Sequence, residues 1–219
     1  MNSTQTLADL AVAHPVASGV FLTHELDFCC HGRRPLAEAC LEKGLDPDVV
    51  LAEITARETS SPDSVSWAEA SLSDLIIHIV DFYHARLRAD LPEIVALAKK
   101  VEAVHAEKAT CPRGLHAHLE SVHAAVLDHL DKEEGILFPL IISGRGFHSC
   151  GPIAVMEREH EEHGENLALT RRLTGNLTLP PEACTTWQAL YVRLASLEAE
   201  LMEHIHLENN ILFQRALAA

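Results

Sequence analysis

The chain has little glycine, few aromatic residues and few basic residues. Only ten of its 219 residues are glycine and 5% are aromatic, which disfavours a β-rich fold with many tight turns. Lysine and arginine number 17 against 32 acidic residues, for a net charge of −15. Binding to nucleic acid or to an anionic membrane surface normally requires a basic face, so we expect neither partner.

Long apolar runs are also lacking. The longest, such as Ile-Leu-Phe-Pro-Leu-Ile-Ile from residue 136, fall well short of the roughly 20 residues that span a bilayer. The first residues contain no basic stretch followed by an apolar core, as a secretory signal peptide would,. We therefore expect a cytoplasmic protein whose six cysteines are mostly thiols,.

Helical signals run through the whole sequence and predict an all-α protein. Residues 1–60 predict a small domain of short helices, with Pro35 and Pro47 in first helical turns and Gly44 at a helix end,. The polar stretch 59–66 predicts a linker,. Residues 67–219 predict an up-down-up-down four-helix bundle, with helices over 71–100, 112–142, 152–173 and 182–217,.

The strongest signal is an internal repeat in the second and fourth of these long segments. His129 and Glu133, like His204 and Glu208, are four positions apart, and in both copies two residues separate the Glu from an Ile-Leu-Phe triplet. A His and a Glu at this spacing lie on one face of a helix. Both pairs take positions where a bundle core calls for Leu or Ile, as in the second segment's face of Val122, Val126, His129, Glu133, Ile136 and Leu140.

The other two long segments each place a histidine on the predicted core face. In the first segment that face is Ile77, Val80, His84, Leu87 and Leu91, and in the third it is Ile153, Met156, His160, His163 and Leu167. His129 follows His84 by 45 positions, and His204 follows His160 by 44. The bundle therefore reads as two copies of one helical hairpin.

Two carboxylates and four imidazoles inside an apolar core predict a metal centre. A lone core histidine is more often simply hydrogen-bonded, but an uncompensated buried carboxylate costs several kcal/mol, and no Lys or Arg on these faces offsets it. The ligands are too many for one tetrahedral zinc. We predict two non-haem iron ions, bridged by the carboxylates and an oxo or hydroxo group, with zinc or manganese left open. The predicted ligands are His84, His129, Glu133, His160, His204 and Glu208.

The remaining histidines are assigned by their position. His105 and His163 are left open as extra ligands or as hydrogen-bond partners of ligands. Glu159, next to His160, is either such a partner or part of a solvated helix face. Eight others are expected at the surface: His14, His24, His78, His116, His118, His123, His148 and His206.

Cys29 and Cys30 form the second candidate site, with a catalytic role. They precede the helix that Pro35 is predicted to begin, and Arg33 and Arg34 are close in sequence; both features favour thiolate. A disulfide between adjacent residues would be strained, because their Cα atoms are only about 3.8 Å apart. The pair is either a reactive site for iron, nitric oxide or another protein, or two small residues in a tight turn. The other cysteines are expected to be structural or incidental: Cys40, Cys111, Cys150 and Cys184.

These motifs resemble the repair-of-iron-centres proteins, the YtfE, ScdA, DnrN and NorA group. The resemblance covers nearly the whole chain, through FCCHG in the N-terminal part and the haemerythrin-like motifs HLDKEEGILFP, GPIAVMEREHEEHGE, PPEACTTW and HIHLENNILFQRAL. It implies a di-iron centre on the six residues above and a bacterial cytoplasmic stress protein that restores iron–sulfur clusters damaged by nitric oxide or oxidants. His31 and Gln214 depart from the family pattern, which has a small residue and proline there.

The expected function is therefore a di-iron protein that supplies iron to damaged iron–sulfur proteins. One alternative is an enzyme that reduces nitric oxide at the two irons, and another is a module that binds O2 or NO for sensing or storage. A simple carrier or sensor would not need Cys29 and Cys30. A homodimer is left open.

Overall fold

The computed structural model describes residues 1–60 and 66–218. Within these residues it contains helices and no strand, apart from an isolated bridge between Thr6 and Pro35, so the predicted all-α class is confirmed. Two compact units are present: Met1–Ile76 together with Met202–Ala219, and Ile77–Leu201. The middle of the predicted linker, 61–65, lies outside the described residues, and the predicted domain boundary stays a prediction.

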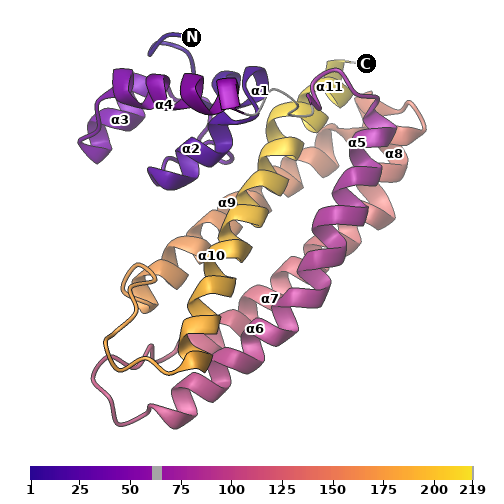
Figure 1. Ribbon diagram of the computed structural model, residues 1–219. Helices are drawn as coiled ribbons and strands as arrows, with labels where there is room; N and C mark the ends of the chain where they lie inside the picture. The colour runs from indigo at the N-terminus through magenta and orange to yellow at the C-terminus, as the bar shows by residue number, and fades with distance from the viewer. Residues whose placement is uncertain (61–65, 219) are drawn as a thin grey trace. The chain divides into compact units, whose positions relative to one another are not determined.

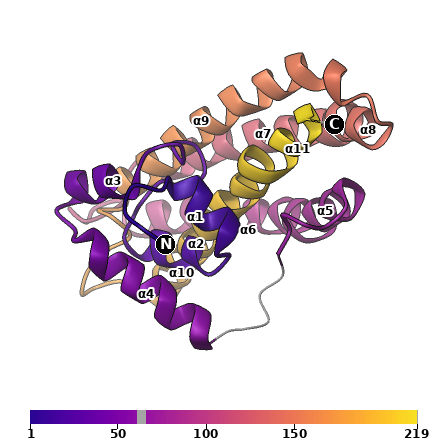
Figure 2. The same cartoon turned by 90° about the horizontal axis from the view of Figure 1, so that it is seen from above.

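The first unit contains the short helices expected at the N-terminus, which Figure 2 shows gathered together: α1 (Leu7–Ala13), α2 (Ala17–Thr23), α3 (Leu36–Lys43) and α4 (Pro47–Ser60). Their ends follow ordinary capping rules. The Asp46 carboxylate accepts a hydrogen bond from the Asp48 N–H (2.9 Å) at the start of α4, and Gly44 ends α3 with a φ of 66°,. The apolar faces meet in a core that includes Leu10, Phe21, Phe28, Leu36 and Ile54.

Gly32 lies in the segment between α2 and α3, where the chain folds back on itself. Its carbonyl accepts a hydrogen bond from the Ala8 N–H (2.8 Å), and a Cβ added to it would collide with the Phe28 carbonyl oxygen. We expect Gly32→Ala to destabilise the protein by about 1–3 kcal/mol, as overpacking does. Thermal unfolding measures this; Gly135→Ala is the control, since a Cβ there meets nothing within 4 Å. Equal unfolding temperatures for Gly32→Ala and the wild type would contradict the structure at this position.

The second unit is a four-helix bundle built from α6 (Ala85–Val104), α7 (Leu115–Lys132), α9 (Cys150–Leu173) and the part of α10 (Thr185–His206) that precedes residue 202 (Figure 1). Helix α7 packs against both α6 and α9. Ion pairs connect α10 to its two neighbours: Arg193 to Asp90 of α6 (3.3 Å) and Glu198 to Arg171 of α9 (2.6 Å). These contacts close a ring of four helices, which confirms the predicted bundle.

Short segments of π-helix interrupt the long helices: η1 (Ile79–His84) follows α5 (Leu72–His78), η2 (Glu133–Leu137) precedes α8 (Phe138–Ile142), and η4 (Leu207–Leu212) precedes α11 (Phe213–Ala218). In η2 the Phe138 N–H donates to the Glu133 carbonyl, and in η4 the Phe213 N–H donates to that of Glu208. The internal repeat therefore extends to the backbone. Each segment carries a predicted metal ligand, consistent with the occurrence of π-bulges at functional sites.

The π-helical segments also make two of the predicted core positions wrong. Ile77 and Ile136 are each 55% exposed, whereas Ile79 and Leu137 are buried. A π turn inserts one residue into the 3.6-residue period. Counting by threes and fours across η1 or η2 therefore selects the wrong neighbour.

None of the helices in the described ranges is long and apolar enough to cross a membrane.

Candidate metal centre

Four of the six predicted ligands lie together in the second unit. His84 ends η1, His129 is in the last turn of α7, Glu133 begins η2, and His160 lies in α9. All four are at most 2% exposed. The bundle thus places three imidazoles and a carboxylate where core packing would otherwise place aliphatic side chains.

The distances between these side chains suit a bound cation. The Glu133 carboxylate lies 3.3 Å from Nε2 of His84 through one oxygen and 3.3 Å from Nε2 of His129 through the other. The Nε2 atoms of His129 and His160 are 3.1 Å apart. Spacings of about 3 Å are those of neighbouring ligands around one transition-metal ion with bonds of about 2.1 Å. Nitrogen and oxygen donors together fit iron, so the donor set is compatible with a di-iron centre,.

Two further carboxylates orient the imidazoles from behind. Nδ1 of His84 donates to Glu134 (2.8 Å), and Nδ1 of His129 donates to Glu159 (2.9 Å). These hydrogen bonds place the ring proton on Nδ1, so that the unprotonated Nε2 of each ring is on the side of the Glu133 carboxylate, where it can bind a metal,. Burial acts to raise the pKa of both carboxyls, but the hydrogen bonds outweigh it and hold each pKa below its usual value. Both groups are therefore carboxylates at neutral pH.

A basic residue supports each of these carboxylates. Arg88 donates to Glu134 (3.0 Å), and Lys132 donates to Glu159 (2.6 Å). The alternative that Glu159 supports a ligand is thereby favoured by the structure. Glu134 was not identified from the sequence, because a second acidic residue directly after Glu133 looks like part of a solvated face. In both places a carboxylate holds the imidazole and a basic residue holds the carboxylate. These residues form an outer layer of hydrogen bonds around the predicted ligands.

Replacing either outer carboxylate is expected to weaken metal binding without removing a ligand. For Glu134→Gln and Glu159→Gln we expect a loss of affinity of about 10- to 100-fold, because the imidazoles lose their orientation and some basicity. Competition with a chelator during anaerobic iron loading measures the effect. The control is Glu161→Gln, an exposed residue of the same helix as Glu159. Unchanged affinity in both variants would contradict the assigned role.

The remaining two predicted ligands, His204 and Glu208, lie in the first unit. They are 1% and 0% exposed, and Nε2 of His204 lies 3.2 Å from the Glu208 carboxylate. The corresponding pair in the other unit, His129 and Glu133, has a distance of 3.3 Å. The two copies of the repeat therefore share their local side-chain geometry.

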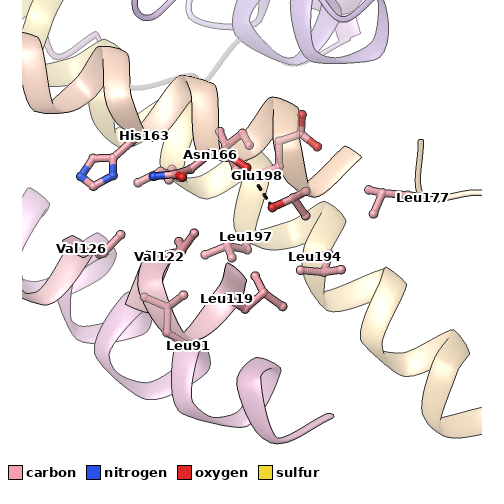
Figure 3. A pocket seen from close by; sticks show the side chains of 13 residues that line it. Leu91, Leu119, Val122, Val126, His163, Asn166, Leu177, Leu194, Leu197 and Glu198 are labelled. Atoms are coloured by element: carbon pink, nitrogen blue, oxygen red, sulfur yellow. Dashed lines mark hydrogen bonds between the residues drawn. The ribbon is translucent and has the colours of Figure 1, made fainter. Parts of the chain in front are cut away.

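The two histidines left open from the sequence differ in their surroundings. His163 is buried, and its ring meets the His129 ring edge-on at 5.0 Å; it also lines a narrow, mainly apolar cavity with Val126, Leu119 and Leu177 (Figure 3). His105 lies elsewhere, with Nε2 3.2 Å from the Cys184 sulfur. A hydrogen bond from the backbone N–H of Trp187 is the main cause that lowers the pKa of the Cys184 thiol. Cys184 therefore has a histidine partner that the sequence did not indicate.

Cys29 and Cys30 are adjacent thiols, and all six cysteines are free of disulfides. The hydrogen bond with Cys30, burial and the nearby Asp27 together raise the pKa of Cys29 well above its usual value. The prediction that the surroundings favour thiolate is therefore wrong for Cys29. Arg34, one of the two guanidinium groups invoked for it, pairs instead with Glu42 (2.8 Å).

The sequence predicted His206 at the surface, and this prediction is wrong. It is 2% exposed, and burial lowers its pKa to about 4. Its ring lies edge-on to Phe28 at 5.4 Å, and its Nδ1 is 2.8 Å from the Asn210 side-chain nitrogen. A neutral imidazole that accepts this hydrogen bond belongs to the core of the first unit.

The chain is similar to known proteins over nearly its full length. Residues 75–216 match the haemerythrin HHE cation-binding domain, and residues 3–58 match ScdA_N, a domain of unknown function. The iron–sulfur cluster repair protein YtfE of Escherichia coli O81 (strain ED1a) is 48% identical over 214 residues, which cover 98% of this chain and 97% of the relative. The protein of the same name from Escherichia fergusonii gives the same identity and coverage.

Proposed function

Because the chain belongs to the haemerythrin-like iron–sulfur cluster repair proteins of the YtfE type, we propose that it restores damaged iron–sulfur clusters by supplying iron. The observation that carries this proposal is the buried group of His84, His129, Glu133 and His160, with carboxylates behind two of the imidazoles. Nitric oxide and oxidants are the proposed agents of damage, and damaged iron–sulfur proteins are the proposed partners. The cytoplasmic location and a homodimer stay predictions.

The proposed ligands for the two irons are the six residues of the repeat: His84, His129, Glu133, His160, His204 and Glu208. Three observations support this set. All six are at most 2% exposed, both His-x-x-x-Glu pairs have the same spacing and backbone pattern, and the match to the cation-binding domain spans all six positions. Without cations, two buried carboxylates would strongly destabilise the core.

The protein's own residues would hold and release the iron that is delivered to damaged clusters. Glu134 and Glu159 keep the His84 and His129 rings turned with Nε2 toward the metal. Bound iron would supply ferrous ions for cluster rebuilding and positions at which NO or O2 can bind. We propose that Cys29 and Cys30, the candidate catalytic pair, accept iron or nitric oxide during transfer, since two adjacent free thiols in one loop offer two soft ligands,.

The test is recovery of an aconitase-type enzyme in an extract after its cluster has been damaged by NO. We expect the iron-loaded protein to restore activity, and His129→Ala, which lacks a ligand, to restore much less. Glu161→Ala, an exposed change in the same bundle, should behave like the wild type. Recovery no greater than that given by His129→Ala would refute the proposal.

Two further measurements separate the alternative functions. Nitrous oxide measured over several turnovers would indicate NO reduction at the two irons. A carrier or sensor should be unaffected by replacing Cys29 and Cys30 with serine, whereas cluster repair should be impaired.

A further inference from the structure

The loop that carries Cys29 and Cys30 is organised around one carboxylate. One oxygen of Asp27 accepts hydrogen bonds from the backbone N–H groups of Cys29 (3.2 Å) and Cys30 (3.0 Å). The same oxygen lies 3.4 Å from the Cys29 sulfur. The other oxygen accepts a hydrogen bond from Nδ1 of His31 (2.6 Å). Asp27 thus fixes the backbone of the thiol pair and stands beside its sulfurs.

The two sulfurs are spaced for a shared metal ion. They are 3.6 Å apart, whereas a disulfide bond requires about 2.05 Å. A tetrahedral ion with metal–sulfur bonds of about 2.3 Å holds its two sulfurs about 3.8 Å apart. One ligand atom each from Asp27, Cys29 and Cys30 lie within 4.8 Å of one another. These three side chains therefore match one coordination shell with little rearrangement.

The loop is held by the helix segment that follows Glu208. The side-chain amide of Asn209 donates to the Cys29 carbonyl (3.1 Å), and that of Asn210 donates to the Phe28 carbonyl (3.0 Å). All of these residues belong to the first unit. Two amide donors on a helix therefore limit the motion of the thiol loop, which preorganises its ligands.

The two copies of the internal repeat differ at the positions of these asparagines. At the matching positions the first copy has Glu134 and Gly135. There Glu134 orients the His84 ring, whereas the second copy uses its two amides to anchor the loop of Cys29. The two copies therefore differ at the positions whose side chains hold the thiol loop in the second copy.

We propose that Asp27, Cys29 and Cys30 form a second metal site that binds one divalent, thiophilic transition-metal cation. Its identification with Fe2+ as cargo rests on the proposed function; the site itself does not. Cys30 and Asp27 are only half-buried, so a cation can reach the site from solvent. Binding forms two metal–sulfur bonds and releases both thiol protons to the solvent, with no change of oxidation state.

Cobalt(II) is the probe that tests the site, titrated anaerobically into the iron-loaded, full-length protein. We expect one additional cobalt ion per chain and a strong near-ultraviolet sulfur-to-cobalt absorption band. Cys29→Ser and Cys30→Ser should abolish the band, and Asp27→Asn should weaken binding about tenfold or more. The Asn oxygen can still accept the two backbone hydrogen bonds, so that variant keeps the loop. The control is Cys150→Ser, which removes an exposed thiol of the other unit.

Each outcome decides for or against the site. No band in the wild type, or an unchanged band in Cys30→Ser, would overturn it, as would an affinity for cobalt that Asp27→Asn leaves unchanged. Iron content measured in parallel shows whether cobalt has instead replaced iron in the bundle, which would also count against it. A positive titration with no aconitase recovery would retain the site and reject iron supply as the function; the reverse would retain the function and reject the site.

Discussion

Replacing Glu133 with alanine is expected to remove most of the bound iron. Glu133 is 0% exposed and faces His84 and His129 at 3.3 Å each, so one substitution withdraws a carboxylate from two imidazole neighbours. We expect the affinity for iron to fall by more than about 100-fold, beyond the effect of losing an outer partner. Glu208→Ala should behave alike, because it holds the matching position in the repeat.

Iron per chain after anaerobic reconstitution measures this loss. The matched control is Glu161→Ala, an exposed glutamate next to His160, which should bind as much iron as the wild type. If Glu133→Ala retains full iron content and a native circular dichroism spectrum, Glu133 is not a ligand.

Removing the metal is expected to destabilise the protein markedly. Without cations, the carboxylates of Glu133 and Glu208 would remain buried beside imidazoles. Uncompensated buried charge of this kind costs about 3–5 kcal/mol. For a chain of this size that corresponds to a fall in the unfolding temperature of roughly 10 °C. Thermal unfolding with and without a chelator measures the difference.

A leucine in place of Glu133 provides the control for this explanation. It removes the buried carboxylate, so in chelator the variant should be at least as stable as the metal-free wild type. Adding iron should stabilise the wild type and not the variant. Equal unfolding temperatures for the iron-loaded and metal-free wild type would show that the buried acids do not depend on metal.

The sequence was sufficient to predict the long helices and the burial of the repeated His and Glu residues, because polar residues at regular core positions are a strong periodic signal. Helix α9, predicted over 152–173 and found over Cys150–Leu173, shows how well this works. The exposure of Ile77 and Ile136 could not be predicted. It follows from π turns, whose extra residue has no local sequence signature comparable to proline or glycine.

The sequence also did not predict hydrogen bonds between residues that are far apart in the chain. Glu134 orients His84 across 50 positions, and Asn209 reaches the Cys29 carbonyl across 180. For Cys29, the neighbouring arginines suggested a thiolate, but Asp27 and Cys30 are its contacts and raise its pKa. The arginines are close to Cys29 in sequence, but the loop folds around the Asp27 carboxylate. The pKa of Cys29 is therefore raised, whereas sequence proximity predicted that it would be lowered.

Iron stoichiometry combined with Mössbauer spectroscopy of anaerobically purified protein tests the central claim most directly. The prediction is two high-spin iron ions per chain with nitrogen and oxygen ligands, both lost together in His129→Ala. A stable, fully folded protein isolated without metal, or iron spectra that do not change when His129 is replaced, would contradict the existence of a di-iron centre on these residues.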